Sequence, residues 1–327
     1  MLPNKRDAFS KFFAIEQLAG GVYAALGRPD GVVHSNAGII DLGGRTLVFD
    51  AFNSPQAGED LAAAALSLTG HRHTWLVNSH MHWDHWVGNQ AFVEDATIIA
   101  TAGTRESMPQ SSAQLRQYRE DPGRLEQEIQ QEADSLVKET DPLQKKGREV
   151  ILSRWRHLHA VLPNLRLTLP DLTFAGELAF HGTRRNVRLV EHAPGHAPSD
   201  AYLVLPDEGI VFTGDLAFFA AQPYMGSCDP EGWLAWHDEA AALDAQAFVP
   251  GHGPLGTEED LALQRRYIVA LMGMIDGVIA GKGGVEDALA EGLPPPFDAW
   301  IGEGRGRFEI NVRALFEQRL KRQSAAA

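Results

Sequence analysis

Apolar and polar positions alternate through the N-terminal part of the chain in a pattern that predicts short strands and one helix. Apolar runs rich in strand-forming residues cover residues 21–26, 37–42, 45–50, 74–78 and 97–100. Gly43-Gly44, between two of these runs, is a hairpin turn signal. The Ala- and Leu-rich stretch 57–68 has the composition of a helix. This part of the chain therefore predicts a mixed α/β arrangement.

The same kind of pattern returns in the C-terminal half. Strand-like runs cover residues 172–181, 187–191, 201–205, 209–213 and 247–249. Helical stretches cover residues 230–243, 257–280 and 308–321. We find no repeats and no linker long enough to separate two domains. Residues 1–327 are therefore expected to form one α/β domain, a four-layer αββα sandwich that ends in C-terminal helices at about 257–321.

A helical insertion is predicted between the two strand-rich parts, from about Thr104 to Leu162. Charged residues and Gln dominate it, and Asp121-Pro122-Gly123 and Asp141-Pro142 divide it into about three helices. Two interpretations are open: a lid over a functional site, or an exposed arm that forms a dimer. As a lid it would offer these contacts: Arg105, Arg154, Trp155 and Arg156.

Charge and composition narrow the functional classes. The 43 acidic and 29 basic residues give a net charge of −14, which argues against nucleic acid or an anionic membrane as partner. No apolar run follows the basic pair Lys5-Arg6, and no apolar stretch is long enough to span a bilayer. The single cysteine, Cys228, permits no internal disulfide and is expected to be inert. We expect a cytoplasmic protein with a small-molecule substrate. Whether it forms a homodimer is left open by the sequence.

Residues 80–85 read His-Met-His-Trp-Asp-His and carry the strongest chemical signal of the chain. Imidazole nitrogen and carboxylate oxygen are ligands that Zn²⁺ and similar divalent metals prefer. The preceding apolar run predicts that the motif begins where a strand ends. His80 and His82 can then face one centre, and Asp84 and His85 a neighbouring one. These four candidate ligands are more than a single metal needs from one loop, so their spacing suggests two metals side by side.

Three later residues share this setting, because each is a ligand type that follows a strand and lies beside glycine: His196, Asp215 and His252. The other histidines have no comparable pattern of neighbouring candidate ligands in the sequence. The pairs His71/His73 and His157/His159 are predicted to lie on the surface. The remaining histidines without neighbouring ligands are His34, His181, His192 and His237, of which His192 is close enough to His196 to support it.

The order of these residues resembles the pattern of the metallo-β-lactamase-fold hydrolase superfamily, in which an H-x-H-x-D-H loop is followed by His, Asp and His at strand ends. The resemblance runs from about Val22 to Pro254 and implies an αββα sandwich with a two-metal site between the sheets. It implies that His80, His82 and His196 hold one metal and that Asp84, His85 and His252 hold the other. Asp215 would bridge the two. Ser79 stands where many members have Thr, and Val87 where many have Gly.

The resemblance also implies the reaction. A hydroxide between two divalent ions, expected to be zinc with manganese or iron as alternatives, would attack an ester, lactone, thioester or amide carbonyl. Asp84 and Asp215 are the expected catalytic carboxylates, and Asp84 would orient the hydroxide or transfer a proton. Because Asp215 is an Asp, and because residues 196–215 look like the glyoxalase-II-like and lactonase-like branch, we favour that branch over a true β-lactamase.

Two other classes compete with a hydrolase. One is an oxidoreductase similar to the persulfide dioxygenases, which use one iron; a metal count separates it from a two-metal enzyme. The other is a binding protein that has kept the fold but lost the chemistry, which the seven intact ligands disfavour. The aromatic and sulfur side chains expected near the cleft are Trp83, Trp86, Phe218, Phe219, Tyr224 and Met225. Tyr224 is also a candidate oxyanion donor.

Overall fold

The computed structural model describes residues 9–28, 31–297, 300 and 306–326, and two β-sheets lie face to face within them. The first sheet has seven strands in chain order: β1 (Phe13–Ala19), β2 (Val22–Gly27), β3 (Ala37–Asp41), β4 (Thr46–Phe49), β5 (His73–Val77), β6 (Thr97–Thr101) and β7 (Leu172–Phe174). The second sheet has the order β12 (Ala247–His252), β11 (Ile210–Phe218), β10 (Asp200–Leu205), β9 (Asn186–His192) and β8 (Glu177–His181).

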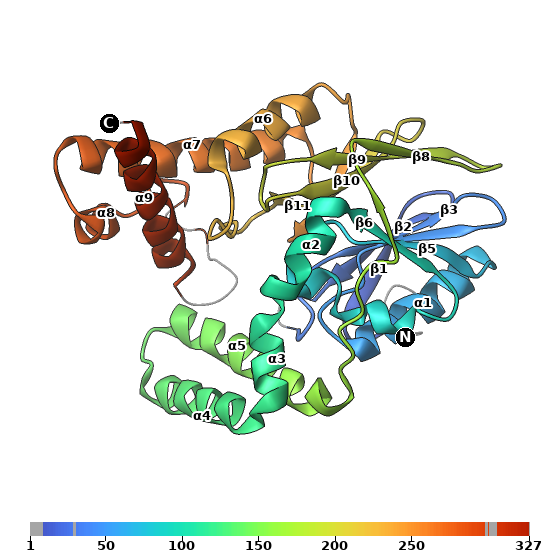
Figure 1. The fold of residues 1–327 in the computed structure, drawn as a ribbon, viewed down its shortest axis with the longest axis horizontal. Coiled ribbons are helices and arrows are strands. Elements are labelled where there is room, and N and C mark those ends of the chain that lie inside the picture. Colours follow the sequence, from blue (N-terminus) through green and yellow to red (C-terminus); the bar gives the residue numbers. More distant parts are fainter. Residues whose placement is uncertain (1–8, 29–30, 298–299, 301–305, 327) are drawn as a thin grey trace.

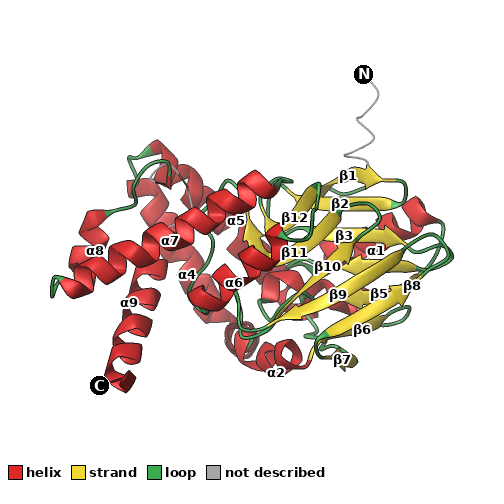
Figure 2. Cartoon of the chain, turned by 90° about the horizontal axis from the view of Figure 1, so that it is seen from above, coloured by secondary structure: helices red, strands yellow, loops and turns green. Residues whose placement is uncertain are grey.

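Helices cover the outer face of each sheet, so the predicted four-layer αββα sandwich is confirmed (Figures 1 and 2). Helix α1 (Pro55–Thr69) packs on the first sheet. Helices α6 (Pro230–Ala241) and α7 (Glu258–Ala280) pack on the second. Helices α8 (Val285–Glu291) and α9 (Arg307–Ala326) follow α7. Within the described ranges, no helix has both the length and the apolar character to cross a membrane.

Successive side chains of a strand point to opposite faces of its sheet, so one set packs between the two sheets and the other packs against the outer helices. On β3, Ile40 enters the core between the sheets, whereas Ile39 packs toward α1. On β10, Leu203 enters the core between the sheets, whereas Tyr202 packs toward α6 and α7. The sheets meet closely at Gly38, where a side chain would lie 2.6 Å from the ring of Phe212 on β11.

The insertion contains four helices rather than about three: α2 (Ala102–Ser111), α3 (Ala113–Glu120), α4 (Pro122–Lys138) and α5 (Pro142–Val161). Apolar side chains of α3, α4 and α5 form a small core that packs against Val87 and Trp83 of the histidine-rich loop. Trp155 lies in this core, while Arg105 and Arg154 donate to the carbonyls of Pro170 and Gly31. The insertion and the C-terminal helices lie at the same end of the sandwich (Figures 1 and 2).

Three sequence predictions need correction. The single strand expected over residues 172–181 is two strands in different sheets, because Gly176 with a φ of 72° turns the chain between them. Strand β1 and helix α8 were not predicted; the alternation in β1 includes Glu16 and Gln17, which hides it. His73 is buried rather than on the surface. The basic pair Lys5-Arg6, after which the sequence has no apolar run, lies outside the described residues.

Gly38→Ala is expected to destabilise the protein by about 1–3 kcal/mol, because the new methyl group collides with a buried ring. Gly20→Ala is the matched control, since the added methyl meets nothing within 4 Å and the site is exposed. Equilibrium unfolding in urea measures both variants. Equal unfolding midpoints for the two would show that the sheets are not in contact at Gly38.

Candidate metal centre

The topology brings the ligand-bearing chain segments to one edge of the sandwich. Strands β4, β5 and β6 run parallel, so the loop that follows β5 opens at the same edge as the end of β4. In the second sheet β9, β11 and β12 share one direction, because β10 is antiparallel to both β9 and β11 and β11 is parallel to β12. His196 follows β9, Asp215 lies on β11, and His252 ends β12.

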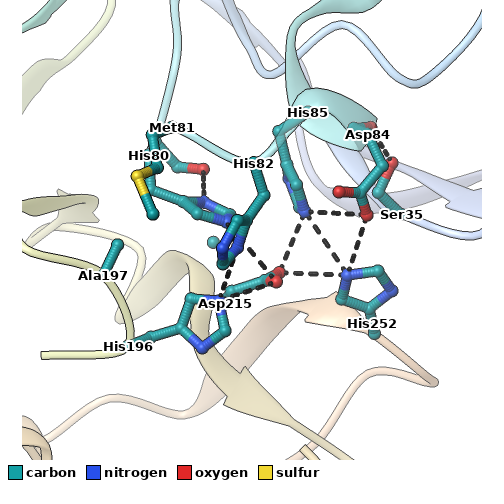
Figure 3. A network of polar contacts seen from close by, with 12 residues as sticks. Ser35, His80, Met81, His82, Asp84, His85, His196, Ala197, Asp215 and His252 are labelled. Atoms are coloured by element: carbon teal, nitrogen blue, oxygen red, sulfur yellow. Dashed lines mark hydrogen bonds and ion pairs between the residues drawn. The ribbon is translucent and has the colours of Figure 1, made fainter. Parts of the chain in front are cut away.

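Three histidines form the first cluster of the site (Figure 3). His82 Nδ1 lies 2.9 Å from His80 Nε2 and 2.9 Å from His196 Nε2. One Nδ1 cannot exchange a hydrogen bond with two ring nitrogens at once, so the arrangement fits three donors that face a common centre. A metal ion at that centre would explain the convergence.

The second cluster consists of His85, His252 and Asp84. The Nε2 atoms of His85 and His252 are 3.4 Å apart. Asp84 Oδ2 lies 3.5 Å from His85 Nε2 and 3.3 Å from His252 Nε2. The ligand atoms within this group, and likewise those of the first cluster together with Asp215, lie within 4.8 Å of one another. Each group is therefore compact enough to hold one ion.

Asp215 lies between the clusters and contacts both (Figure 3). Its Oδ2 is 3.3 Å from His196 Nε2 and 3.5 Å from His80 Nε2. Its Oδ1 is 3.0 Å from His85 Nε2 and 3.2 Å from His252 Nε2. One oxygen thus faces each cluster. Gly251 permits this approach, since a side chain there would lie 1.9 Å from Asp215 Oδ1.

Contacts behind the rings fix which nitrogen faces the centre. Ser79 Oγ donates to Asp50 Oδ2 and so accepts from His80 Nδ1 at 2.9 Å. Asp50 Oδ2 also accepts from His85 Nδ1 at 2.8 Å. His252 Nδ1 donates to a backbone carbonyl at 3.1 Å. In all three rings Nε2 is therefore the nitrogen that is directed at the site, as metal binding requires.

Burial and neighbouring charges set the protonation states. Burial, together with the adjacent His80, lowers the pKa of His82 to about 3. Burial also holds the pKa of His196 well below its usual range, despite the opposing effect of Asp215. Burial alone would raise the pKa of Asp215, but His252, His85 and His80 hold it well below the usual range. His82 and His196 are therefore neutral, and Asp215 is ionised.

His85 shows which charge this environment favours. Burial lowers its pKa, but Asp215, Asp84 and Asp50 together raise it well above the usual range. The carboxylates thus stabilise a positive charge at this point. A divalent cation between them would take the place of that proton. The donor set of imidazole and carboxylate therefore fits Zn²⁺ or a similar metal.

Two residues of the site were missed by sequence reasoning. Asp50 follows β4 at the same edge as the ligand loop, but it has neither a glycine nor a second ligand beside it, so the pattern that marked the other ligands did not include it. His34 was expected to lack neighbouring ligands, which is wrong: its Nε2 lies 3.2 Å from Asp84 Oδ2 and its ring stacks on His252. No local pattern marks His34, because its partners are far away in sequence.

A cavity of about 400 Å³ opens above the two clusters, and we call it the site cavity. Asp84, Asp215 and His252 line its floor, together with His82, whose Nε2 lies 3.0 Å from Ser227 Oγ. The aromatic side chains that line it are Trp83, Phe218 and Tyr224. The other aromatic and sulfur side chains expected near the cleft are core residues instead: Trp86, Phe219 and Met225.

The remaining predictions about single residues have mixed outcomes. Ser111 is the one described residue of the insertion that lines the site cavity, and none of the residues suggested as lid contacts does. His157 and His159 lie on α5, away from the two metal-binding groups. His192 is held by the Gly232 carbonyl at 2.8 Å. Cys228 is buried, and burial raises the pKa of its thiol, which fits an inert residue.

Comparison with known proteins identifies the family. The sequence profile of the metallo-beta-lactamase superfamily matches residues 30–252. The chain therefore belongs to the metallo-beta-lactamase superfamily, and with two His/Asp groups of this geometry it is a metal-dependent hydrolase. No curated protein matches the chain.

Solved structures with the same fold share little sequence with this chain. A metallo-beta-lactamase from Pontibacter korlensis is 16% identical, with a TM-score of 0.57 over 79% of this chain and 99% of its own. The metallo-beta-lactamase FIM-1 from Pseudomonas aeruginosa, in a mono-zinc form, is 15% identical, with a TM-score of 0.56 over 80% of this chain and 96% of its own. A third, from Hirschia baltica, is 15% identical, with a TM-score of 0.55 over 79% and 98%. These similarities support the fold and leave the substrate open.

Asp50→Asn is expected to weaken metal binding at the second cluster by about 10- to 100-fold, because it removes the carboxylate that orients His85. Asn suits the site sterically, since Asp50 has a φ of 62° and Asn tolerates that backbone. Zinc competition with a chromophoric chelator measures the affinity. The control is Asp95→Asn, which removes a surface carboxylate paired with Arg72. Equal zinc affinities in both variants would contradict the orienting role.

Proposed function

We propose that this protein is a dinuclear-metal hydrolase that cleaves an acyl bond in an ester, lactone, thioester or amide. The observation that carries the proposal is the position of Asp215, with one carboxylate oxygen toward each ligand cluster. A carboxylate that serves a single ion has no need of a second group of histidines around its other oxygen. The proposal includes zinc as the metal, because imidazole and carboxylate donors suit it.

Each part of the site has a role in this chemistry. His80, His82 and His196 would hold one ion, Asp84, His85 and His252 the other, and Asp215 both. Such a pair of ions, when bound, supplies an activated water and an electrophile for the carbonyl oxygen. Asp84 lines the site cavity and lies opposite His34, so it can orient the attacking water by accepting a hydrogen bond from it.

The walls of the site cavity favour a carbon-rich acyl substrate. Trp83, Phe218 and Tyr224 supply apolar surface beside the metal-binding floor. Arg307 is the single lysine or arginine among the described residues that line the cavity. A multiply phosphorylated substrate would need more cations than this. These features support the glyoxalase-II-like and lactonase-like branch.

Metal-loaded protein is expected to bind two ions per chain and to hydrolyse at least one acyl substrate class. The test is metal analysis after reconstitution with zinc or manganese, followed by a screen of esters, lactones, thioesters, phosphodiesters and β-lactams. About one iron per chain together with persulfide oxidation would favour the dioxygenase-like alternative. Hydrolysis confined to β-lactams would favour a true β-lactamase. Two bound ions with no hydrolysis of any of these classes would contradict the proposal.

Asp215→Ala is expected to lose at least one of the two ions, because no other carboxylate contacts both clusters in the described part of the chain. Cys228→Ala is the control, since its thiol donates only to the Met225 carbonyl and lies away from both metal-binding groups. Metal content after gel filtration in metal-free buffer measures the difference. Equal metal content in the two variants would refute the bridging role.

A further inference from the structure

We propose that Ser227 is a positioning residue for the first cluster, which holds the ring of His82 with Nδ1 toward the metal-binding centre, and that helix α9 fixes Ser227 in that place. The inference rests on the proposed function, because it concerns one of the two ions, and it adds a structural element to that function. Helix α9 lies beyond residues 30–252, which match the family profile. The affinity of the first cluster for metal would therefore depend on a helix outside the matched region.

His82 faces the centre with a different nitrogen from its neighbours in the first cluster. Its Nδ1 lies 2.9 Å from His80 Nε2 and 2.9 Å from His196 Nε2, so Nδ1 is the atom that converges with them (Figure 3). A neutral imidazole that gives its Nδ1 lone pair to a metal carries its proton on Nε2. The form of His82 that binds metal is therefore the one with a proton on Nε2, and an acceptor beside Nε2 selects that form.

Ser227 supplies this acceptor. Its Oγ lies 3.0 Å from His82 Nε2 and is, within the described residues, the one hydrogen-bond partner of that nitrogen. The His82 ring also has more freedom than the others, because it is half-buried whereas the other four ligand imidazoles are buried. A flip of this ring would move Nδ1 away from the centre and break the bond to Ser227. The hydrogen bond therefore opposes the flip and keeps Nδ1 in place for the metal.

Helix α9 fixes the loop between β11 and α6, which carries Ser227, on both sides of that residue. Before it, the Met225 N–H donates at 2.9 Å to the side chain of Asn311, which is fully buried. After it, Gln318 Nε2 donates to the Cys228 carbonyl at 3.0 Å. Because the backbone is held on either side, Ser227 cannot move away from the metal-binding floor without breaking contacts to α9. The helix thus sets the position of the hydroxyl that holds the ligand ring.

Ser227→Ala is expected to weaken zinc binding at the first cluster by about 10- to 100-fold, because it removes the hydrogen bond that orients a ligand ring. Ser227→Thr should restore most of the affinity, since it keeps the hydroxyl. The control is Cys228→Ala, the next residue of the same loop, whose thiol donates to the Met225 carbonyl and to no ligand. Zinc competition with a chromophoric chelator measures all three variants of the full chain. Equal affinities in Ser227→Ala and Cys228→Ala would overturn the role of Ser227.

Gln318→Met tests the role of α9, because it removes the donor to the loop and keeps a side chain of similar size. It is expected to weaken zinc binding by a smaller factor than Ser227→Ala does. In the Ser227→Ala background the same substitution should have no further effect, since α9 acts through Ser227. Arg313→Met, whose guanidinium pairs with Glu286 and Glu309 on the surface of the same helix, should leave the affinity unchanged. Equal losses from Gln318→Met with and without the Ser227 hydroxyl would overturn the role of α9.

Nitrogen-15 NMR of the histidine rings separates failure of this inference from failure of the proposed function. Wild type, with and without zinc, is expected to show a His82 Nε2 proton that exchanges slowly with water. Ser227→Ala should lose the slow exchange, because Nε2 then faces the water of the site cavity, while the other ligand rings keep their signals. If this difference is found but no second ion and no hydrolysis are, the proposed function is wrong and the role of Ser227 stands. Identical His82 signals in the two proteins would overturn that role whatever the hydrolysis.

Discussion

The site depends on carboxylates that are buried among histidines. Asp215 and Asp50 are almost inaccessible to water, and a buried ionised carboxylate is costly unless charged or hydrogen-bonded partners surround it. His85 lies against both, and Asp84 adds a third negative charge nearby. Such a cluster is stable only with added positive charge. A divalent cation supplies more positive charge than a protonated imidazole does. The same residues are therefore better suited to a metal centre than to a network of ion pairs alone.

The fold serves this cluster by closing two sheets around it. His80, Asp84 and His85 come from the loop after β5 in the first sheet, whereas Asp215 and His252 come from the second sheet. Residues 34–36, in the loop between β2 and β3, contact both the loop that carries Asp84 and the chain around His252. Ser35 Oγ donates to the Asp84 carbonyl at 2.6 Å, and Asn36 Nδ2 donates to the Pro250 and Gly253 carbonyls at 2.9 Å each. The position of Asp84 relative to His252 within the second cluster therefore depends on these backbone contacts as well as on a bound metal.

Sequence alone predicted the layers, and the seven residues that it named as candidate ligands come together in two groups in the structure. Six of those ligands lie at a strand end or in the loop after it, where a glycine or a second ligand marks the site, whereas Asp215 lies within β11 beside Gly214 and not after a strand as expected. Asp50 also follows a strand but has neither a glycine nor a second ligand beside it, so it gives a weaker signal. His34 has no local signal at all, because it meets Asp84 only through the packing of the β2–β3 loop. The division of residues 172–181 between two sheets depends on tertiary packing, which periodicity does not report.

The central claim is that Asp215 joins two ions in one centre. The most direct measurement is a crystal structure of the zinc-loaded protein with anomalous diffraction recorded above and below the zinc edge. The account predicts two anomalous peaks about 3.5–4 Å apart, with one Asp215 oxygen toward each. One peak at full occupancy in the His80, His82 and His196 cluster, with Asp84 and His252 turned away from it and no second peak in the presence of excess zinc, would contradict the account.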